Sequence, residues 1–151
     1  MTDRSEWKTP DFDALSWHDC SVYGFKLEER KHGTGDLLLD IDFIVEWLCH
    51  NDRPWQWRVA PATLTFHNIF DLRFEVDYAA ASAAIEPFTL DGIEREELRY
   101  PNGATTYKWR LPINWPKGLI TFESPGFTQV LRRPPILVDR QALLLGERQG
   151  G

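Results

Sequence analysis

The chain has 151 residues, of which 42% are hydrophobic and 26% charged, and its formal net charge is −6. A chain of this length forms one domain and buries about 68–70% of the surface that it exposes when unfolded, so folding requires no metal or disulfide. The negative charge argues against a nucleic-acid binder, which normally carries a basic surface, and it suits a basic protein partner.

The first predicted strand covers residues 20–28, and the clearest strand pattern follows at residues 36–47, DLLLDIDFIVEW. Here apolar residues recur at every second position from Leu37 to Trp47, whereas two aspartates would interrupt a helical stripe. Between the two stretches lies RKHGTGD, whose glycines favour a hairpin loop. We therefore expect these two strands to pair antiparallel.

A polar break, HNDRPWQWR, follows this hairpin. The AAASAA run at residues 79–84 is interpreted as a connector, because Pro87 prevents a longer helix. The segment 136–146 fits either a strand or a short helix. Further strands are predicted wherever apolar and polar residues alternate between turn sequences such as PNG and SPGF. They cover residues 62–67, 72–78, 94–100, 105–113, 119–123 and 128–132.

Short strands separated by Gly, Pro and Asn predict a mainly β fold. We expect an antiparallel sheet, arranged as a sandwich or as a strongly curved, barrel-like meander, with one or two short helical turns. The sequence predicts one domain over residues 1–151, with loosely packed ends at residues 1–14 and 147–151.

The only cysteines, Cys20 and Cys49, lack the close spacing of a zinc or redox motif, and a disulfide between them stays open. The start, MTDRSEWKTPDF, has no apolar stretch typical of a signal peptide. No apolar run approaches the roughly 18 residues of a membrane span. We therefore expect a cytoplasmic protein without a membrane partner.

The stretch LSWHDC places Trp17, His18 and Asp19 in a row before the first strand. One interpretation is a site for a divalent cation, since imidazole and carboxylate are suitable ligands. The other is structural, with a buried Trp17 and with Asp19 accepting hydrogen bonds from turn amides. The structural interpretation is favoured, because the sequence spacing gives no sign that further ligands lie near His18 and Asp19. Those further ligands would be Asp40, Asp42 and His67.

Asp40 and Asp42 are predicted on one strand face, about 6.6–6.8 Å apart along the backbone. Such a pair can perform acid–base chemistry of the glycosidase type, yet it is also common on a solvated face. Glu46 extends this face, and Glu75 and Asp77 join it if their strands are neighbours. The result would be an acidic sheet surface.

Motifs of nucleophilic or phosphate chemistry are absent from the sequence: it has no G-x-S-x-G, P-loop or G-x-G-x-x-G. Trp47, Trp55 and Trp57 could stack on a base or a sugar, although a hydrophobic cluster with one exposed edge is the simpler interpretation.

Three stretches together, SWHDC, LLLDIDFIVEW and VAPATLTFHNIFDLRFEVDY, resemble small bacterial β-rich proteins of unknown function. Some of those proteins lie near toxin systems and are described as immunity-type proteins. The resemblance covers residues 15–78 and carries no catalytic residues that could be transferred. It implies a stand-alone cytosolic binder and does not identify the partner.

We therefore predict a small non-enzymatic binding protein, of the immunity type, that neutralises a basic partner such as a toxin through an acidic, aromatic-rimmed sheet face. No cofactor, metal, catalytic residue or nucleic acid is expected, and the oligomeric state stays open. Two alternatives remain: a metal- or carboxylate-dependent hydrolase, and an accessory or structural domain. The hydrolase would use His18, Asp19, Asp40 and Asp42. The candidate binding residues are Trp17, His18, Asp19, Asp40, Asp42, Trp47, His67, Glu75 and Asp77.

Overall fold

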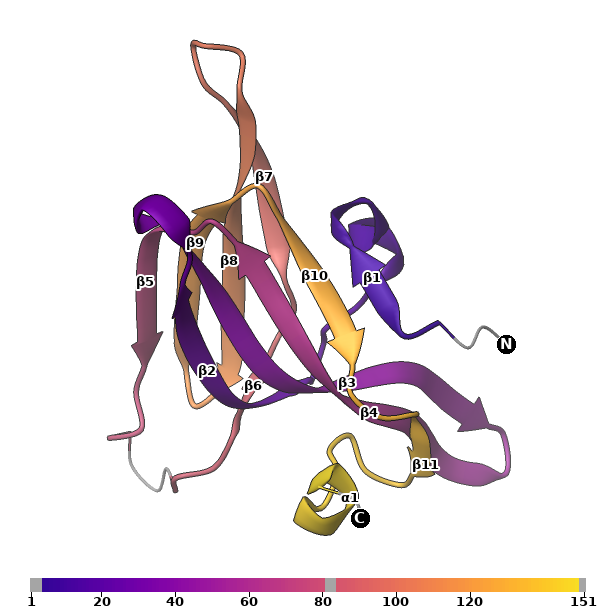
Figure 1. Ribbon diagram of the computed structural model, residues 1–151. Helices are drawn as coiled ribbons and strands as arrows, with labels where there is room; N and C mark the ends of the chain where they lie inside the picture. Colours follow the sequence, from indigo (N-terminus) through magenta and orange to yellow (C-terminus); the bar gives the residue numbers. More distant parts are fainter. Residues whose placement is uncertain (1–3, 81–83, 150–151) are drawn as a thin grey trace.

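A computed structural model describes residues 4–80 and 84–149. Within these residues the strands form one antiparallel sheet, with two short 3-10 helices and one short α-helix (Figure 1). The strands are β1 (Glu6–Lys8), β2 (Ser21–Glu29), β3 (Gly35–His50), β4 (Arg53–His67), β5 (Phe70–Val76), β6 (Phe88–Leu90), β7 (Glu94–Arg99), β8 (Thr105–Trp115), β9 (Gly118–Ser124), β10 (Gly126–Leu131) and β11 (Ile136–Val138). The helices are η1 (Thr9–Ala14), η2 (Lys31–Gly33) and α1 (Leu145–Gln149).

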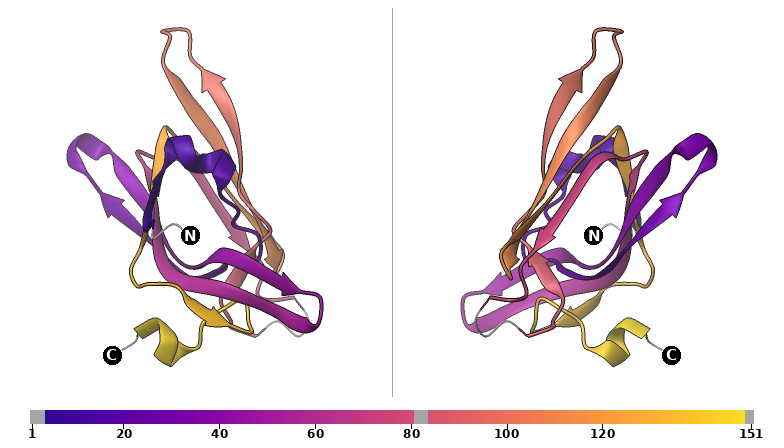
Figure 2. Two further views of the ribbon diagram at one scale, coloured as in Figure 1. Left: turned by 90° about the vertical axis from the view of Figure 1, so that its right-hand side faces the viewer. Right: turned by 90° about the vertical axis from the view of Figure 1, so that its left-hand side faces the viewer.

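The sheet follows the order β1-β10-β4-β3-β2-β6-β8-β9-β5, with β11 also paired to β4 and β7 also paired to β8. It is strongly curved but does not close into a barrel, and the ends of the β2–β3 and β7–β8 hairpins diverge (Figure 2). The prediction of a mainly β, antiparallel fold is therefore confirmed.

The hydrophobic core lies on the inner side of this curved sheet. Strict alternation places every second side chain of each long strand there, which explains the period-two pattern of the sequence. Aromatic rings fill the centre, where Trp109 packs edge-on against Phe66 at 5.0 Å and against Phe127 at 5.9 Å between ring centroids. The core residues that β3 and β4 contribute on the inner side are Leu37, Leu39, Ile41, Phe43, Ala60, Ala62, Leu64 and Phe66, and Ile44 and Val59 are buried on the opposite side.

The strands β3 and β4 form a long hairpin that leaves the body of the protein at the lower right of Figure 1. The stretch HNDRPWQWR was predicted to be a polar break between strands, and this prediction is wrong. Both strands continue through that stretch, and only Asn51 and Asp52 form the turn. The stretch is polar because the end of the hairpin extends into solvent, where a strand needs no buried face.

A one-residue bulge at Val45 interrupts β3. Ile44 pairs with Val59, but the next pair is Glu46 with Arg58, which leaves Val45 without a counterpart on β4. An unbroken ladder would put Trp47 on the core-facing side, as the sequence pattern predicted. The bulge instead places Trp47 on the same side as Asp42, because a one-residue shift reverses the direction of every following side chain.

The strand β5 does not pair with β4, which precedes it in the chain, but with β9. Asn68 and Asp71 adopt left-handed backbone conformations, with φ of 47° and 52°, as the chain leaves β4 and enters β5. As a result β2, β6, β8 and β9 separate β5 from β3 in the sheet. The acidic residues of β3 and β5 therefore do not form the joint acidic face that neighbouring strands would have produced.

Of the ends predicted to pack loosely, residues 1–3 and 150–151 lie outside the described residues. Residues 6–14 form β1 and η1, and Trp7 is buried. The ambiguous segment 136–146 contains both predicted alternatives, because β11 pairs with β4 and α1 begins at Leu145. Part of the proposed connector, residues 81–83, lies outside the described residues. In the described part of the chain, no helix is both long and apolar enough to span a membrane.

Candidate interaction site

One face of the β3–β4 hairpin combines acidic and aromatic side chains. Alternate residues of β4 share this face, and their partners on β3 point the same way because directly paired residues lie on one side of a sheet. The pairs are Asp40 with Thr63, Asp42 with Pro61, Ile44 with Val59 and Trp47 with Trp57. We call this the outer face and define it by Asp40, Asp42, Trp47, Trp55 and Trp57.

The three tryptophans form a cluster near the end of the hairpin. Trp47 lies edge-on to Trp55 and Trp57, with ring centroids 6.3 and 6.0 Å away, and these two stack at 6.4 Å. Trp47 is 38% and Trp55 47% exposed. Among the described residues, the buried indole nitrogen of Trp57 has no hydrogen-bond partner. The cluster thus offers a large aromatic surface to solvent and contains one unused donor.

His18 extends the cluster from the loop before β2. Its ring stacks on Trp47 at 6.1 Å and its Nδ1 lies 3.1 Å from the carbonyl oxygen of Asp91. The Asp91 carboxylate, which is 59% exposed, lies 3.7 Å from the same nitrogen. Trp17, in contrast, is buried in the core and is not part of this surface.

Asp19 serves the loop structure, as the structural interpretation predicted, but through different bonds. Its φ of 63° is left-handed, and its backbone N–H donates to the carbonyl of Leu90. Its carboxylate accepts bonds from the side chains of Asn114 at 3.0 Å and Gln141 at 2.9 Å, rather than from turn amides. Asp19 thereby ties the loop before β2 to β8 and to the C-terminal segment.

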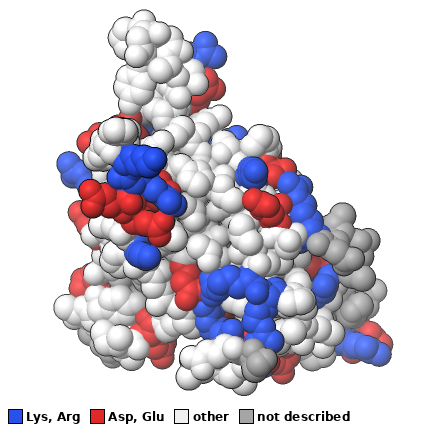
Figure 3. All heavy atoms as spheres, in the orientation of Figure 1, with Lys and Arg blue, Asp and Glu red and all other residues white. Residues whose placement is uncertain are grey.

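The carboxylates of Asp40 and Asp42 are not a solvated pair. Asp42 is fully buried, and both carboxylates contact the guanidinium of Arg148, which is 2.5 Å from Asp40. Asp40 also pairs with Arg132 at 2.6 Å. Figure 3 shows Lys and Arg atoms gathered low in the view, near the C-terminal segment, although the chain as a whole is acidic. Arginines therefore neutralise the acidic half of the outer face.

Tyr23 completes the surroundings of this acidic pair. Its hydroxyl donates to Asp42 at 2.7 Å, and the backbone N–H of Leu143 donates to the same carboxylate at 2.8 Å. Burial raises the pKa of Asp42, while these bonds and Arg148 act against the rise. Burial and the bond to Asp42 also raise the pKa of Tyr23 well above its ordinary value, so Tyr23 stays a donor at neutral pH.

His67 lies at the opposite end of the hairpin. Its Nε2 is 2.8 Å from the hydroxyl of Thr128, and its Nδ1 is 3.5 Å from the buried carboxylate of Asp36. Asp36 also accepts bonds from Arg30 at 2.9 Å and from the backbone of Asn68 at 3.0 Å. This cluster fixes the turn between β4 and β5 and contacts none of the other predicted site residues.

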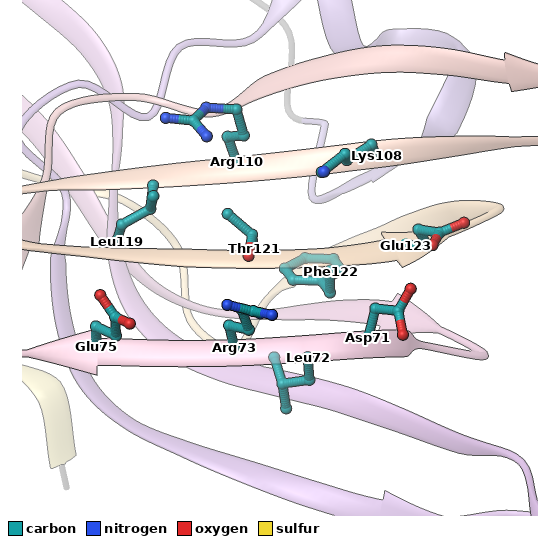
Figure 4. Close-up of a pocket in the computed structure, with 10 residues that line it drawn as sticks. All are labelled: Asp71, Leu72, Arg73, Glu75, Lys108, Arg110, Leu119, Thr121, Phe122 and Glu123. Atoms are coloured by element: carbon teal, nitrogen blue, oxygen red, sulfur yellow. The ribbon is translucent and has the colours of Figure 1, made fainter.

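Glu75 and Asp77 lie apart from the outer face. Asp77 caps a turn by accepting the backbone N–H of Ala79. Glu75 lines a hollow of about 720 Å³ on the outside of β5, β8 and β9. In Figure 4 the side chains of Arg73, Lys108 and Arg110 lie around this hollow together with three carboxylates. Because the charges are balanced and solvated, we do not assign a ligand to it.

The predicted site residues thus do not gather in one place. Within the described part of the chain, no group of three or more His, Cys, Asp or Glu side chains could hold a metal ion. No hydrogen bond or ion pair among the described residues joins His18 or Asp19 to Asp40 or Asp42, so the observed contacts do not assemble the four groups of the hydrolase hypothesis. Tyr23, Asp91 and Arg148 were not predicted from the sequence. Arg148 is 106 residues from Asp42, and no sequence pattern links residues that far apart.

Comparisons with protein-family models, with curated proteins and with solved structures found no match to this chain. The residues and their geometry therefore carry the functional argument.

Proposed function

We propose that this chain is a non-enzymatic binding protein that holds a basic partner protein against its outer face. As an antidote of the immunity type, it would neutralise that partner in the cytoplasm. The single observation that carries the proposal is the exposed tryptophan cluster at the end of the projecting hairpin. Tryptophan is the residue most enriched at binding hot spots, where it contributes large buried areas with little loss of side-chain freedom.

The position of the cluster supports a binding role over a structural one. Trp47 and Trp55 keep 38% and 47% of their surface in solvent, whereas the core of the sheet is complete without them. Trp47 and Trp57 also stabilise the arm as a cross-strand pair, but this pairing does not use the indole surface that Trp47 and Trp55 leave in solvent. A partner that covers the arm would bury the remaining aromatic surface.

The charge around the cluster indicates a basic partner. The exposed carboxylate of Asp91 lies beside His18 and therefore at the edge of the aromatic surface. Indole faces attract guanidinium and ammonium groups, and a nearby carboxylate strengthens that preference. The net charge of −6 would accelerate the approach of a basic protein at low salt. The resemblance of residues 15–78 to immunity-type proteins is in line with these features.

The test uses the protein encoded next to the gene of this chain. We expect its expression alone to arrest bacterial growth and co-expression of this chain to restore it. Trp55→Ala should then weaken the purified complex about tenfold or more in calorimetry, because a central tryptophan is lost. Phe70→Ala is the matched control, since Phe70 is 63% exposed but lies beyond the far end of β4, about 40 Å along the strand from Trp55.

Two results would contradict the proposal. One is a neighbouring protein that neither binds this chain nor impairs growth. The other is a complex whose dissociation constant changes equally little for Trp55→Ala and Phe70→Ala, which would place the partner on another surface. Circular dichroism of both variants verifies that the sheet is intact.

A further inference from the structure

The side chain of Arg148 fills a site built by the sheet. Only 7% of this side chain is exposed. Its guanidinium contacts Asp40 and Asp42 with two different nitrogens and lies 3.6 Å above the centre of the Tyr23 ring. A guanidinium can bond two carboxylates with its fork of donors while its face rests on an aromatic ring, and an ammonium group has neither the fork nor the flat face.

All three groups that surround this guanidinium belong to β2 and β3, whereas Arg148 belongs to the C-terminal segment, residues 139–149. The helix α1 in that segment has five residues and buries none of them. Leu144 and Leu145 are 58% and 69% exposed. A helix this short is not stable alone, so the segment depends on its contacts with the sheet.

Besides Arg148, several hydrogen bonds attach the segment: Tyr23 donates to the carbonyl of Leu143 at 3.3 Å, and Arg133 donates to the carbonyl of Glu147 at 3.2 Å. Leu143 is buried and donates its backbone N–H to Asp42, and Gln141 donates to Asp19. Arg140 and Glu147 pair with each other within the segment, at 2.9 Å, and so do not attach it to the sheet. Arg148 adds ion pairs with Asp40 and Asp42 that fasten the segment to the outer face.

The segment lies across the same face that carries the tryptophan cluster. The strand β11, which leads into it, pairs Val138 with Trp57, and Leu143 then reaches Asp42. A partner bound to the tryptophans would consequently touch the segment as well. Its basic side chains would meet two carboxylates that are already matched to a guanidinium.

We propose that the C-terminal segment is a latch, and that Arg148 occupies a guanidinium site which an arginine of the basic partner enters by displacing it. The identity of that partner rests on the proposed function, but the site and its chemistry do not. Without Arg148, the fully buried carboxylate of Asp42 lacks its cation, and an uncompensated buried charge is strongly unfavourable. The emptied site should therefore take up a guanidinium from solution.

The first experiment measures thermal unfolding of Arg148→Ala with N-ethylguanidinium chloride, kept far below denaturing concentrations. We expect a lowered Tm that rises saturably with the compound and rises much less with N-ethylammonium, which has no planar fork. The wild type should not respond, since its site is filled. Arg140→Ala is the matched control, because it removes an arginine of the same segment and leaves Arg148 in place.

The second experiment measures binding of fluorescein-labelled hexa-arginine. We expect the affinity to rise at least about tenfold from wild type to Arg148→Ala, with Arg148→Lys between them. Adding Asp42→Asn to Arg148→Ala should abolish the gain. The lysine variant keeps a cation on the latch, so the order of affinities remains measurable even if the alanine variant does not fold.

The latch is refuted if neither Arg148 variant gains affinity for the peptide, or if N-ethylguanidinium stabilises wild type and variant alike. Arg148 would then be a structural ion pair. Such a result leaves the proposed function intact when Trp55→Ala still weakens the complex. Conversely, a confirmed guanidinium site with a neighbouring protein that does not bind would refute the proposed function alone.

Discussion

The indole nitrogen of Trp17 donates a hydrogen bond of 2.7 Å to the side-chain oxygen of Gln129 inside the core. Gln129 is fully buried, and its amide nitrogen has no hydrogen-bond partner among the described residues. The bond therefore provides the only side-chain partner of that amide in the described structure. It also joins the loop before β2 to β10, which are separated by 112 positions in the sequence.

Replacing Trp17 with phenylalanine should lower the free energy of unfolding by about 1–3 kcal/mol, because the buried Gln129 amide then has no partner. Urea denaturation measures the change. The double variant Trp17→Phe with Gln129→Leu should recover much of the loss, since removing both polar partners is far less costly than removing one. A double variant that is as unstable as the sum of the two single changes would contradict this explanation.

Asp36 should make the protein sensitive to acid. Burial raises its pKa, but the bonds from Asn68, Arg30 and the nearby His67 outweigh burial, so the net pKa is lowered. The ordinary pKa of this carboxyl, 3.8, applies in the unfolded chain. Because the pKa is lower in the folded protein, ionised Asp36 stabilises the fold above pH 3.8, and this stabilisation is lost as the pH falls from 3.8 towards the folded-state pKa.

Asp36→Asn should therefore show a shallower decline of stability below about pH 4 than the wild type, as measured by urea denaturation across pH. Asp13→Asn, at an exposed position, is the control and should leave the slope unchanged. Equal slopes for wild type and Asp36→Asn would show that this cluster does not govern acid stability. Asp42 acts in the opposite direction, because burial raises its pKa.

Two glycines in strands should respond differently to alanine. A Cβ at Gly118 would overlap the backbone carbonyl oxygen of Glu75 on the neighbouring strand, whereas a Cβ at Gly24 meets nothing within 4 Å. We expect Gly118→Ala to cost about 1–3 kcal/mol through overpacking. Gly24→Ala should be neutral or stabilising by up to about 1 kcal/mol, because alanine restricts the unfolded chain. The reverse order of stabilities would disprove the predicted contact.

The two cysteines should react at very different rates. Both are free thiols, Cys20 is buried, and Cys49 is exposed. Burial raises the pKa of Cys20 to about 12, which suppresses its thiolate at neutral pH. A thiol reagent such as Ellman's should label one site rapidly in the native protein and the second only on unfolding. Cys49→Ala should abolish the rapid phase, and its persistence in that variant would contradict the burial of Cys20.

The sequence predicted most of the long strands that face the core, because burial enforces strict alternation there. The run from Leu37 to Phe43 is an example, since its odd-numbered residues are all buried. The sequence did not predict the three-residue strands β1 and β6, although Trp7, Phe88 and Leu90 are buried, because three residues are too few to show alternation. The prediction was wrong where burial ends. At HNDRPWQWR the strands continue into solvent, where composition no longer reports on backbone conformation.

The site was harder to predict than the fold, because contacts distant in sequence determine it. Asp40 and Asp42 were correctly placed on one strand face, but their guanidinium partner comes from the other end of the chain. The expected acidic neighbours lie elsewhere: Glu75 belongs to β5, which is far from β3 in the sheet, and Asp77 follows the end of β5. Strand order is a property of the whole chain and leaves no mark in the local pattern.

The bulge at Val45 also affects how this chain compares with others. From Trp57 to His67 the strand β4 has no surplus residue, so at Val45 it sets the phase of the hairpin and β3 absorbs the extra residue. Nearer the turn a second register shift, between Leu48 and His50, places the extra residue on β4. A relative with a regular hairpin would lack a residue at this position, and a correct alignment would place a one-residue gap there. Alignment methods that forbid gaps inside strands would instead shift the tryptophan of β3 out of phase and pair it with a core position.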